Sequence, residues 1–248
     1  MPPIPDVVFK PTGEHTASLI FLHGLGDTSA GWAELFKSLR GVFPNVKMVL
    51  PTAPEQPGTR ARPIAVSPRL LTPFSRSPPA RPSFPTVTLN MGMSMPSWYD
   101  IKGLDARANE SCDGIDQSKA RVDALIKEEL DAGIPANRII LGGFSQGAGV
   151  AYYTGLQQSE PLAGILAMSG YLPKSGDLAN FLKSKDTPVL HCHGEADQVV
   201  RLVWAEESIA KLKEAGVNPT FKTYPGMQHS SDPNEVRDVV AWMQQRLA

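Results

Sequence analysis

Short apolar runs alternate with segments of helical periodicity along most of the chain. The runs have the length of buried strands, and the segments between them repeat apolar residues every three or four positions, as on the core-facing side of a helix. We expect strands at residues 18–23, 46–50, 138–144, 162–168, 188–193 and 220–224. We expect helices at residues 29–40, 115–130, 146–156, 178–182, 203–212 and 235–247. This repeated order predicts an α/β fold, in which helices cover both faces of a mostly parallel central sheet.

The length of the chain predicts its number of domains, and its balance of charge indicates which classes of partner it can bind. A chain of 248 residues can bury a sizeable core, and no linker separates two cores, so we expect a single domain over residues 1–248. The 24 basic and 25 acidic side chains give a net charge of −1, which provides no general attraction toward nucleic acid. We therefore expect no nucleic-acid partner.

The apolar runs of the sequence indicate where the protein resides in the cell, and its cysteines indicate which metal sites and disulfides it can form. The first ten residues contain neither a basic segment nor the apolar stretch of a secretory signal, and no run is long enough to span a bilayer. We expect a cytoplasmic protein, with the nucleus as a second compartment. Two cysteines exclude a disulfide scaffold and a four-cysteine zinc site, and we expect no metal and no cofactor.

One segment, residues 58–86, departs from the alternating pattern. Residues 57–85, with both end prolines included, contain eight prolines and five arginines, and few apolar residues recur at regular spacing. Such a composition cannot bury enough surface to offset the entropy lost on ordering, so we expect a disordered insertion. Three interpretations stay open: a neutral solvated loop, an arginine-rich surface that makes transient contact with anionic lipid or an acidic partner, and a retained intron.

Residues 143–147 form a Gly-x-Ser-x-Gly pentapeptide with Ser145 at its centre. The pentapeptide follows a predicted strand and opens a predicted helix, which is the context that a nucleophile elbow requires. In such a turn the serine has strained backbone geometry, and the flanking positions must lack a β-carbon. The simpler interpretation is a glycine-rich turn that only packs a helix on a strand. We favour Ser145 as a nucleophile because of the strand–turn–helix context.

The partners of such a serine follow by elimination. In this fold class an acid and then a histidine come after the serine along the chain. Of the five histidines, only His229 lies in a loop beyond the last predicted strand. Asp197 is the best candidate for the acid, because it follows the strand at 188–193 on the same sheet edge as the serine, and Asp177 is the runner-up. The acid would fix the imidazole tautomer and stabilise the imidazolium.

A glycine-rich loop, residues 21–27, leaves the first buried strand. Such a loop can direct a backbone N–H group at a reacting carbonyl, and the N–H of Gln146, directly after the serine, would be the second donor of an oxyanion hole. We expect His23 to brace this loop by hydrogen bonds. His191 and His193 share one face of a strand, but no third ligand lies at a suitable spacing, so we expect no metal there.

Together these motifs resemble the acyl-protein thioesterase branch, of fungal type, of the lysophospholipase/carboxylesterase α/β-hydrolases. The resemblance rests on FLHGLGDTSAGW (21–32), PNVKMVLPTAPEQP (44–57), TLNMGMSMPSWYDI (88–101), RIILGGFSQGAGVA (138–151), SGYLP (169–173), HCHGEADQVV (191–200) and FKTYPGMQHSS (221–231). It implies the α/β-hydrolase fold, a triad of Ser145, Asp197 and His229, and oxyanion donors at Leu25 and Gln146. It also implies hydrolysis of long-chain thioesters on S-palmitoylated proteins, among them Gα subunits, with weak lysophospholipase activity.

Three methionines, Met91, Met93 and Met95, alternate just before Trp98. Methionine is flexible and apolar, so it can line an adaptable slot for an alkyl chain, although a core-facing loop would show the same alternation. The resemblance favours an acyl channel formed by these methionines and Trp98 and bordered by Leu172.

Two other functions stay open on the sequence. A carboxylesterase or lysophospholipase that acts mainly on oxygen esters would use the same triad, because both reactions pass through the same kind of intermediate. A catalytically silent acyl-binding module would lack a triad member or an oxyanion donor, and the sequence contains all of them.

Overall fold

A computed structural model describes residues 4–56, 95–101 and 111–247. The proline-rich segment 58–86 and two of the three alternating methionines, Met91 and Met93, lie outside the described residues. The predictions made for them stay predictions.

A seven-stranded sheet forms the centre of the fold, in the order β1-β3-β2-β6-β7-β8-β9. Its strands are β1 (Val7–Phe9), β2 (Ala17–Leu22), β3 (Val46–Leu50), β6 (Ile139–Phe144), β7 (Gly164–Met168), β8 (Val189–Gly194) and β9 (Thr220–Tyr224). All neighbouring strands are parallel except the edge strand β1, which runs antiparallel to β3. The six strands predicted from apolar runs are therefore confirmed. Strand β1 was not predicted, because its three partly exposed residues form no such run.

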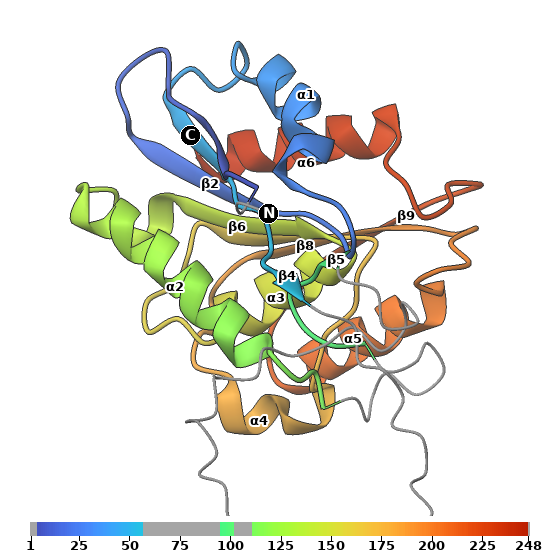
Figure 1. The fold of residues 1–248 in the computed structure, drawn as a ribbon. Coiled ribbons are helices and arrows are strands. Elements are labelled where there is room, and N and C mark those ends of the chain that lie inside the picture. The colour runs from blue at the N-terminus through green and yellow to red at the C-terminus, as the bar shows by residue number, and fades with distance from the viewer. Residues whose placement is uncertain (1–3, 57–94, 102–110, 248) are drawn as a thin grey trace, which may run out of the picture.

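The described residues form six helices, five of which cover the two faces of the sheet (Figure 1). The six helices are α1 (Ser29–Leu39), α2 (Ile115–Asp131), α3 (Gln146–Gly155), α4 (Leu178–Phe181), α5 (Leu202–Glu214) and α6 (Pro233–Arg246). Helices α1 and α6 cover one face, and α2, α3 and α5 cover the other. The sheet separates two apolar cores, because neighbouring residues of a strand point to opposite faces: Leu19 and Phe21 belong to one core, Ile20 and Leu22 to the other. The expected α/β-hydrolase architecture is confirmed.

Short elements complete the fold. Two 3₁₀ turns, η3 (Ala136–Arg138) and η4 (Ser175–Asp177), precede β6 and α4. A two-residue ribbon pairs β4 (Glu55–Gln56) with β5 (Met95–Pro96) in antiparallel register, so the two ends of the intervening segment lie side by side. Within the described ranges, no helix combines the length and the apolar character needed to cross a membrane.

A buried carboxylate ties α2 to the amino ends of two central strands. Glu129 is 1% exposed, and its two oxygens accept hydrogen bonds from Ser18 of β2 (2.6 Å) and Lys47 of β3 (2.6 Å). A carboxylate in the protein interior is costly unless it is paired, so both partners stabilise the docking of α2 on the sheet.

Replacing Lys47 by methionine keeps the aliphatic stem of the side chain but removes the nearer of two ion-pair partners of Glu129, the other being His15 at 3.4 Å. We expect K47M to lower the free energy of unfolding by about 2–4 kcal/mol, because a buried charge then loses its lysine partner. The control is K37M, since the Lys37–Glu34 ion pair on α1 is largely exposed and worth less than about 1 kcal/mol. Urea denaturation measures the free energy of unfolding of both variants. Equal losses of stability in K47M and K37M would contradict the role given to the buried pair.

A second buried carboxyl lies in the first turn of α6. Glu235 is fully buried, and burial raises the pKa of its carboxyl to about 7, with the charge of Asp232 acting in the same direction. The folded protein therefore keeps this group protonated at pH values where the unfolded chain, with its ordinary pKa of 4.5, releases the proton. Because the pKa is raised on folding, the contribution to stability is complete below pH 4.5 and is lost as the pH rises to about 7.

Glu235→Gln removes this titration while keeping the shape of the side chain. We expect the melting temperature of E235Q minus that of wild type to increase by several degrees from pH 4.5 to pH 8. Each kcal/mol of unfolding free energy corresponds to about 2–4 °C in a chain of this size. Thermal melts monitored by circular dichroism at both pH values measure the difference. A difference that does not change with pH would show that Glu235 titrates alike in the folded and unfolded states.

Candidate active site

Ser145 lies at the sharp turn between β6 and α3. Its backbone has φ 55° and ψ −117°, a conformation that non-glycine residues rarely adopt, and such strain is common at functional sites. A β-carbon at Gly143 would lie 2.3 Å from the carbonyl carbon of Gly147, and one at Gly147 would lie 2.2 Å from the carbonyl oxygen of Leu22. Neither position can carry a side chain, so the spacing of the two glycines has the steric reason expected from the sequence.

Two further loops bring His229 and Asp197 to this serine. The Nε2 atom of His229 lies 3.0 Å from the Oγ of Ser145, and its Nδ1 lies 2.7 Å from an oxygen of Asp197. A carboxylate only accepts hydrogen bonds, so Nδ1 carries the imidazole proton and the free lone pair of Nε2 faces the serine hydroxyl, which donates to it. This arrangement allows His229 to remove the proton of Ser145.

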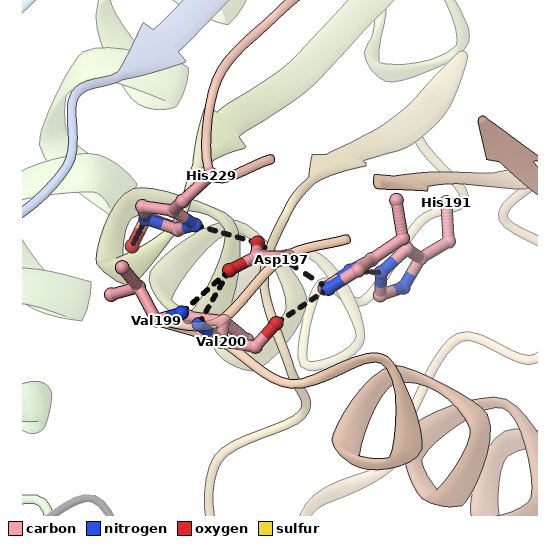
Figure 2. A network of polar contacts seen from close by, with 7 residues as sticks. His191, Asp197, Val199, Val200 and His229 are labelled. Atoms are coloured by element: carbon pink, nitrogen blue, oxygen red, sulfur yellow. Dashed lines mark hydrogen bonds and ion pairs between the residues drawn. The ribbon is translucent and has the colours of Figure 1, made fainter. Parts of the chain in front are cut away.

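Asp197 is held from two sides in the loop after β8 (Figure 2). Its Oδ1 accepts hydrogen bonds from the backbone N–H groups of Val199 (2.8 Å) and Val200 (2.9 Å), while Oδ2 accepts from His229. These bonds offset the cost of burying a carboxylate that is only 3% exposed. The runner-up acid, Asp177, lies in η4 before α4, and the histidine pairs with Asp197 instead.

The ring of His229 packs on Phe144, with ring centroids 4.8 Å apart. This contact restricts the rotation of the imidazole between its two hydrogen-bond partners. The aromatic residue beside the serine therefore supports the histidine, a role that the sequence alone did not reveal.

Backbone amides from two loops face the same space. Gln146 is the first residue of α3, and the first N–H groups of a helix have no partner within the helix. Leu25 lies in the glycine-rich loop after β2, and both residues line one cavity with Ser145 and His229. In the described part of the chain, neither of these amides donates to a protein acceptor. They are thus available to a ligand oxygen beside the serine.

The cavity has a volume of about 260 Å³ and a largely apolar wall. Only some of the lining residues were predicted from the sequence. The lining is Gly24, Leu25, Asp27, Ile101, Phe144, Ser145, Gln146, Tyr171, Val199, Val200 and His229. An apolar wall around a few convergent polar groups is typical of a small-molecule site.

Three predicted acyl-binding residues can be placed. Trp98 is fully buried and does not line the described cavity; its Nε1 donates to the carbonyl of His23 (2.9 Å) and its N–H to the side chain of Gln146 (2.9 Å). Leu172 is also buried outside the lining, and its neighbour Tyr171 contributes to the wall instead. Met95 lies in β5 beside the loop that carries Leu25. Trp98 thus supports the glycine-rich loop after β2 and the side chain of Gln146, and it does not form the surface of the described cavity.

His23 braces the same loop, as expected. Its Nδ1 donates to the carbonyl of Gly24 (2.7 Å), and its Nε2 accepts a hydrogen bond from the N–H of Ala53 (2.9 Å). Burial lowers the pKa of His23, which is consistent with a neutral ring that donates on one side and accepts on the other. Among the described residues, no group of three or more His, Cys, Asp and Glu side chains is arranged to hold a metal ion.

Comparison with known proteins gives the chain relatives along its whole length. The sequence model of the phospholipase/carboxylesterase family matches residues 5–65 and 78–247. Acyl-protein thioesterase 1 of Yarrowia lipolytica is 39% identical over 256 aligned residues, which cover 100% of this chain and 99% of the relative. Acyl-protein thioesterase 1 of Cryptococcus neoformans is 37% identical, with 96% and 95% of the two chains covered.

Comparison with solved structures gives the same family. The crystal structure of acyl-protein thioesterase 2 of Zea mays superposes with a TM-score of 0.78 at 29% identity, and the match covers 98% of this chain and 99% of that one. We conclude from the family match, the full-length relatives and the shared fold that the chain belongs to the phospholipase/carboxylesterase family and is a serine hydrolase of the α/β-hydrolase fold.

Proposed function

We propose that this protein removes long-chain acyl groups from S-palmitoylated proteins by hydrolysing the thioester, with Ser145, His229 and Asp197 as its catalytic triad. The observation that carries the proposal is the unbroken row of hydrogen bonds from Oγ of Ser145 through the imidazole to Asp197, beside an apolar cavity. Thioester substrates are supported by the names of full-length relatives, which are acyl-protein thioesterases. We take residues 1–248 to be one hydrolase domain.

The reaction begins when Nε2 of His229 takes the proton of Ser145 as Oγ attacks the thioester carbonyl carbon. The carbonyl oxygen gains a negative charge, which the N–H groups of Leu25 and Gln146 stabilise at the N-terminus of α3. Asp197 stabilises the imidazolium that forms. The carbon–sulfur bond then breaks, and His229 gives its proton to the departing sulfur, which leaves an acyl group on the serine.

Water completes the cycle. His229 removes a proton from a water molecule as its oxygen attacks the acyl carbon, and the same two amides stabilise the second oxyanion. The bond to Oγ breaks, His229 returns the proton to Ser145, and the fatty acid leaves. The two half-reactions thus use the side chains of Ser145, Asp197 and His229 and the same two backbone amides.

Oxygen esters are the second candidate class of substrate. They pass through the same kind of tetrahedral intermediate, and the matching family is described as phospholipase/carboxylesterase. We propose lysophospholipids as weaker substrates and palmitoylated Gα subunits as protein substrates. A silent acyl-binding module is disfavoured, because the serine, histidine and aspartate are already joined by hydrogen bonds of normal length. We propose a cytoplasmic location, a second one in the nucleus, and transient contact with the membranes that carry such substrates.

Replacing Ser145 by alanine tests the proposed chemistry. We expect wild type to be labelled by a fluorophosphonate probe and to cleave a palmitoyl thioester peptide with a higher kcat/KM than a lysophospholipid. S145A should lose labelling and at least about 10³-fold in kcat, because the nucleophile is gone.

The matched control is Ser38→Ala, which removes an exposed hydroxyl on α1 that bonds only its own helix. S38A should keep full labelling and activity. A folded wild-type protein that the probe does not label would contradict the proposal, and a preference for the lysophospholipid would favour the second candidate.

A further inference from the structure

A row of buried polar groups lies directly behind Asp197, on the side away from His229 (Figure 2). The hydroxyl of Tyr152 in α3 is 2.8 Å from Nδ1 of His191 in β8. Nε2 of His191 is 3.2 Å from Nδ1 of His193, whose Nε2 is 2.8 Å from the carbonyl oxygen of Val200. The row thus runs from the helix that follows the nucleophile, across β8, to the turn that carries the acid.

The far end of the row fixes the position of every proton in it. The carbonyl of Val200 can only accept, so His193 carries its proton on Nε2 and, as a neutral ring, accepts at Nδ1. His191 must then donate from Nε2, which leaves its Nδ1 free to accept the hydroxyl proton of Tyr152. Each hydrogen bond has one donor and one acceptor, with both imidazoles neutral.

The surroundings favour this neutral state. His191, His193 and Tyr152 have almost no exposed surface, and the edge of Phe221 packs against His191. Burial lowers the pKa of His193 and holds that of His191 well below its usual range, and the neighbouring His193 lowers the pKa of His191 as a smaller effect. The tautomers are therefore set by the hydrogen bonds and not by charge.

Val200 connects the row to the triad. Its N–H donates to Oδ1 of Asp197, and its carbonyl accepts from His193, so the residue is held from both sides. His193 itself lies 3.6 Å from the nearer oxygen of Asp197, which is too long for a hydrogen bond. Beside this direct electrostatic contact, the hydrogen-bonded path from His193 to the carboxylate runs through the backbone of Val200.

We propose that His193 is a positioning residue, which orients Asp197 by holding the carbonyl of Val200, with His191 and Tyr152 fixing the tautomer that this requires. The inference rests on the proposed function, since it assigns a task to the acid of that triad. A leucine would fill the same volume without burying ring nitrogens that need partners, so filling the core does not account for two histidines here.

Two substitutions of His193 separate positioning from packing. His193→Leu keeps the bulk but removes the donor, and we expect kcat for p-nitrophenyl butyrate to fall about 10- to 100-fold with KM nearly unchanged, because a misplaced acid misaligns His229. His193→Gln retains an N–H donor that can reach Val200, and kcat should stay within about fivefold of wild type.

Cys192→Ala is the matched control, because Cys192 is buried on the same strand and packs in the opposite core. It should lower the melting temperature and leave kcat unchanged. Should H193L fail to fold, Tyr152→Phe takes its place: it removes only the terminal hydroxyl, and we expect kcat to fall about two- to tenfold.

The outcomes distinguish this inference from the proposed function. A wild-type enzyme that does not hydrolyse the ester, or an active S145A, would refute the proposed function. If wild type is active and S145A is not, unchanged kcat in H193L, or in Tyr152→Phe if H193L does not fold, would overturn the positioning role. Equal losses in H193L and H193Q would overturn it as well, because the donor would then make no difference.

Discussion

The close approach of α3 to β2 at Gly147 is the contact on which the site depends. A β-carbon there would lie 2.2 Å from the carbonyl oxygen of Leu22, so only glycine lets the helix begin directly above the strand ends. At the same turn Ser145 adopts its strained conformation, and the amide of Gln146 lies beside it at the helix N-terminus. Ser145 and the amide of Gln146, the proposed nucleophile and oxyanion donor, are thus positioned by one backbone contact, and a shift of α3 would move both together.

The parallel sheet supplies the rest of the site. Four strands, β2, β6, β8 and β9, end at the same edge, and the loops that follow them carry Leu25, Ser145, Asp197 and His229 in that order. Side chains separated by more than 80 positions in the sequence therefore form direct hydrogen bonds. Groups packed behind this edge contact the site: Phe144 packs on the imidazole of His229, Trp98 donates a hydrogen bond to the carbonyl of His23, and His193 donates to the carbonyl of Val200 in the turn after Asp197.

Local patterns were sufficient to predict the strands, the helices and the three side chains, Ser145, Asp197 and His229, that the fold brings together, because periodicity and chain order are properties of the sequence itself. The strand β1 and the β4–β5 ribbon were not predicted, since two or three residues show no period. The motif around Leu172 predicted that this residue borders an acyl channel, whereas its neighbour Tyr171 is the residue of the motif that lines the described cavity, because side-chain direction in a loop depends on tertiary packing. Likewise, the alternation of His191 and His193 predicted a shared face, while their partner Tyr152, 39 positions away from His191, could be found only in the folded structure.

A crystal structure of the enzyme inactivated by a long-chain alkyl fluorophosphonate tests the central claim most directly, because the phosphonate mimics the tetrahedral intermediate. The account predicts a covalent bond from phosphorus to Oγ of Ser145, and a phosphonyl oxygen about 2.7–3.1 Å from the amide nitrogens of both Leu25 and Gln146. His229 should remain hydrogen-bonded to Asp197. A phosphonate attached to another residue, or an oxygen turned away from both amides, would contradict the account.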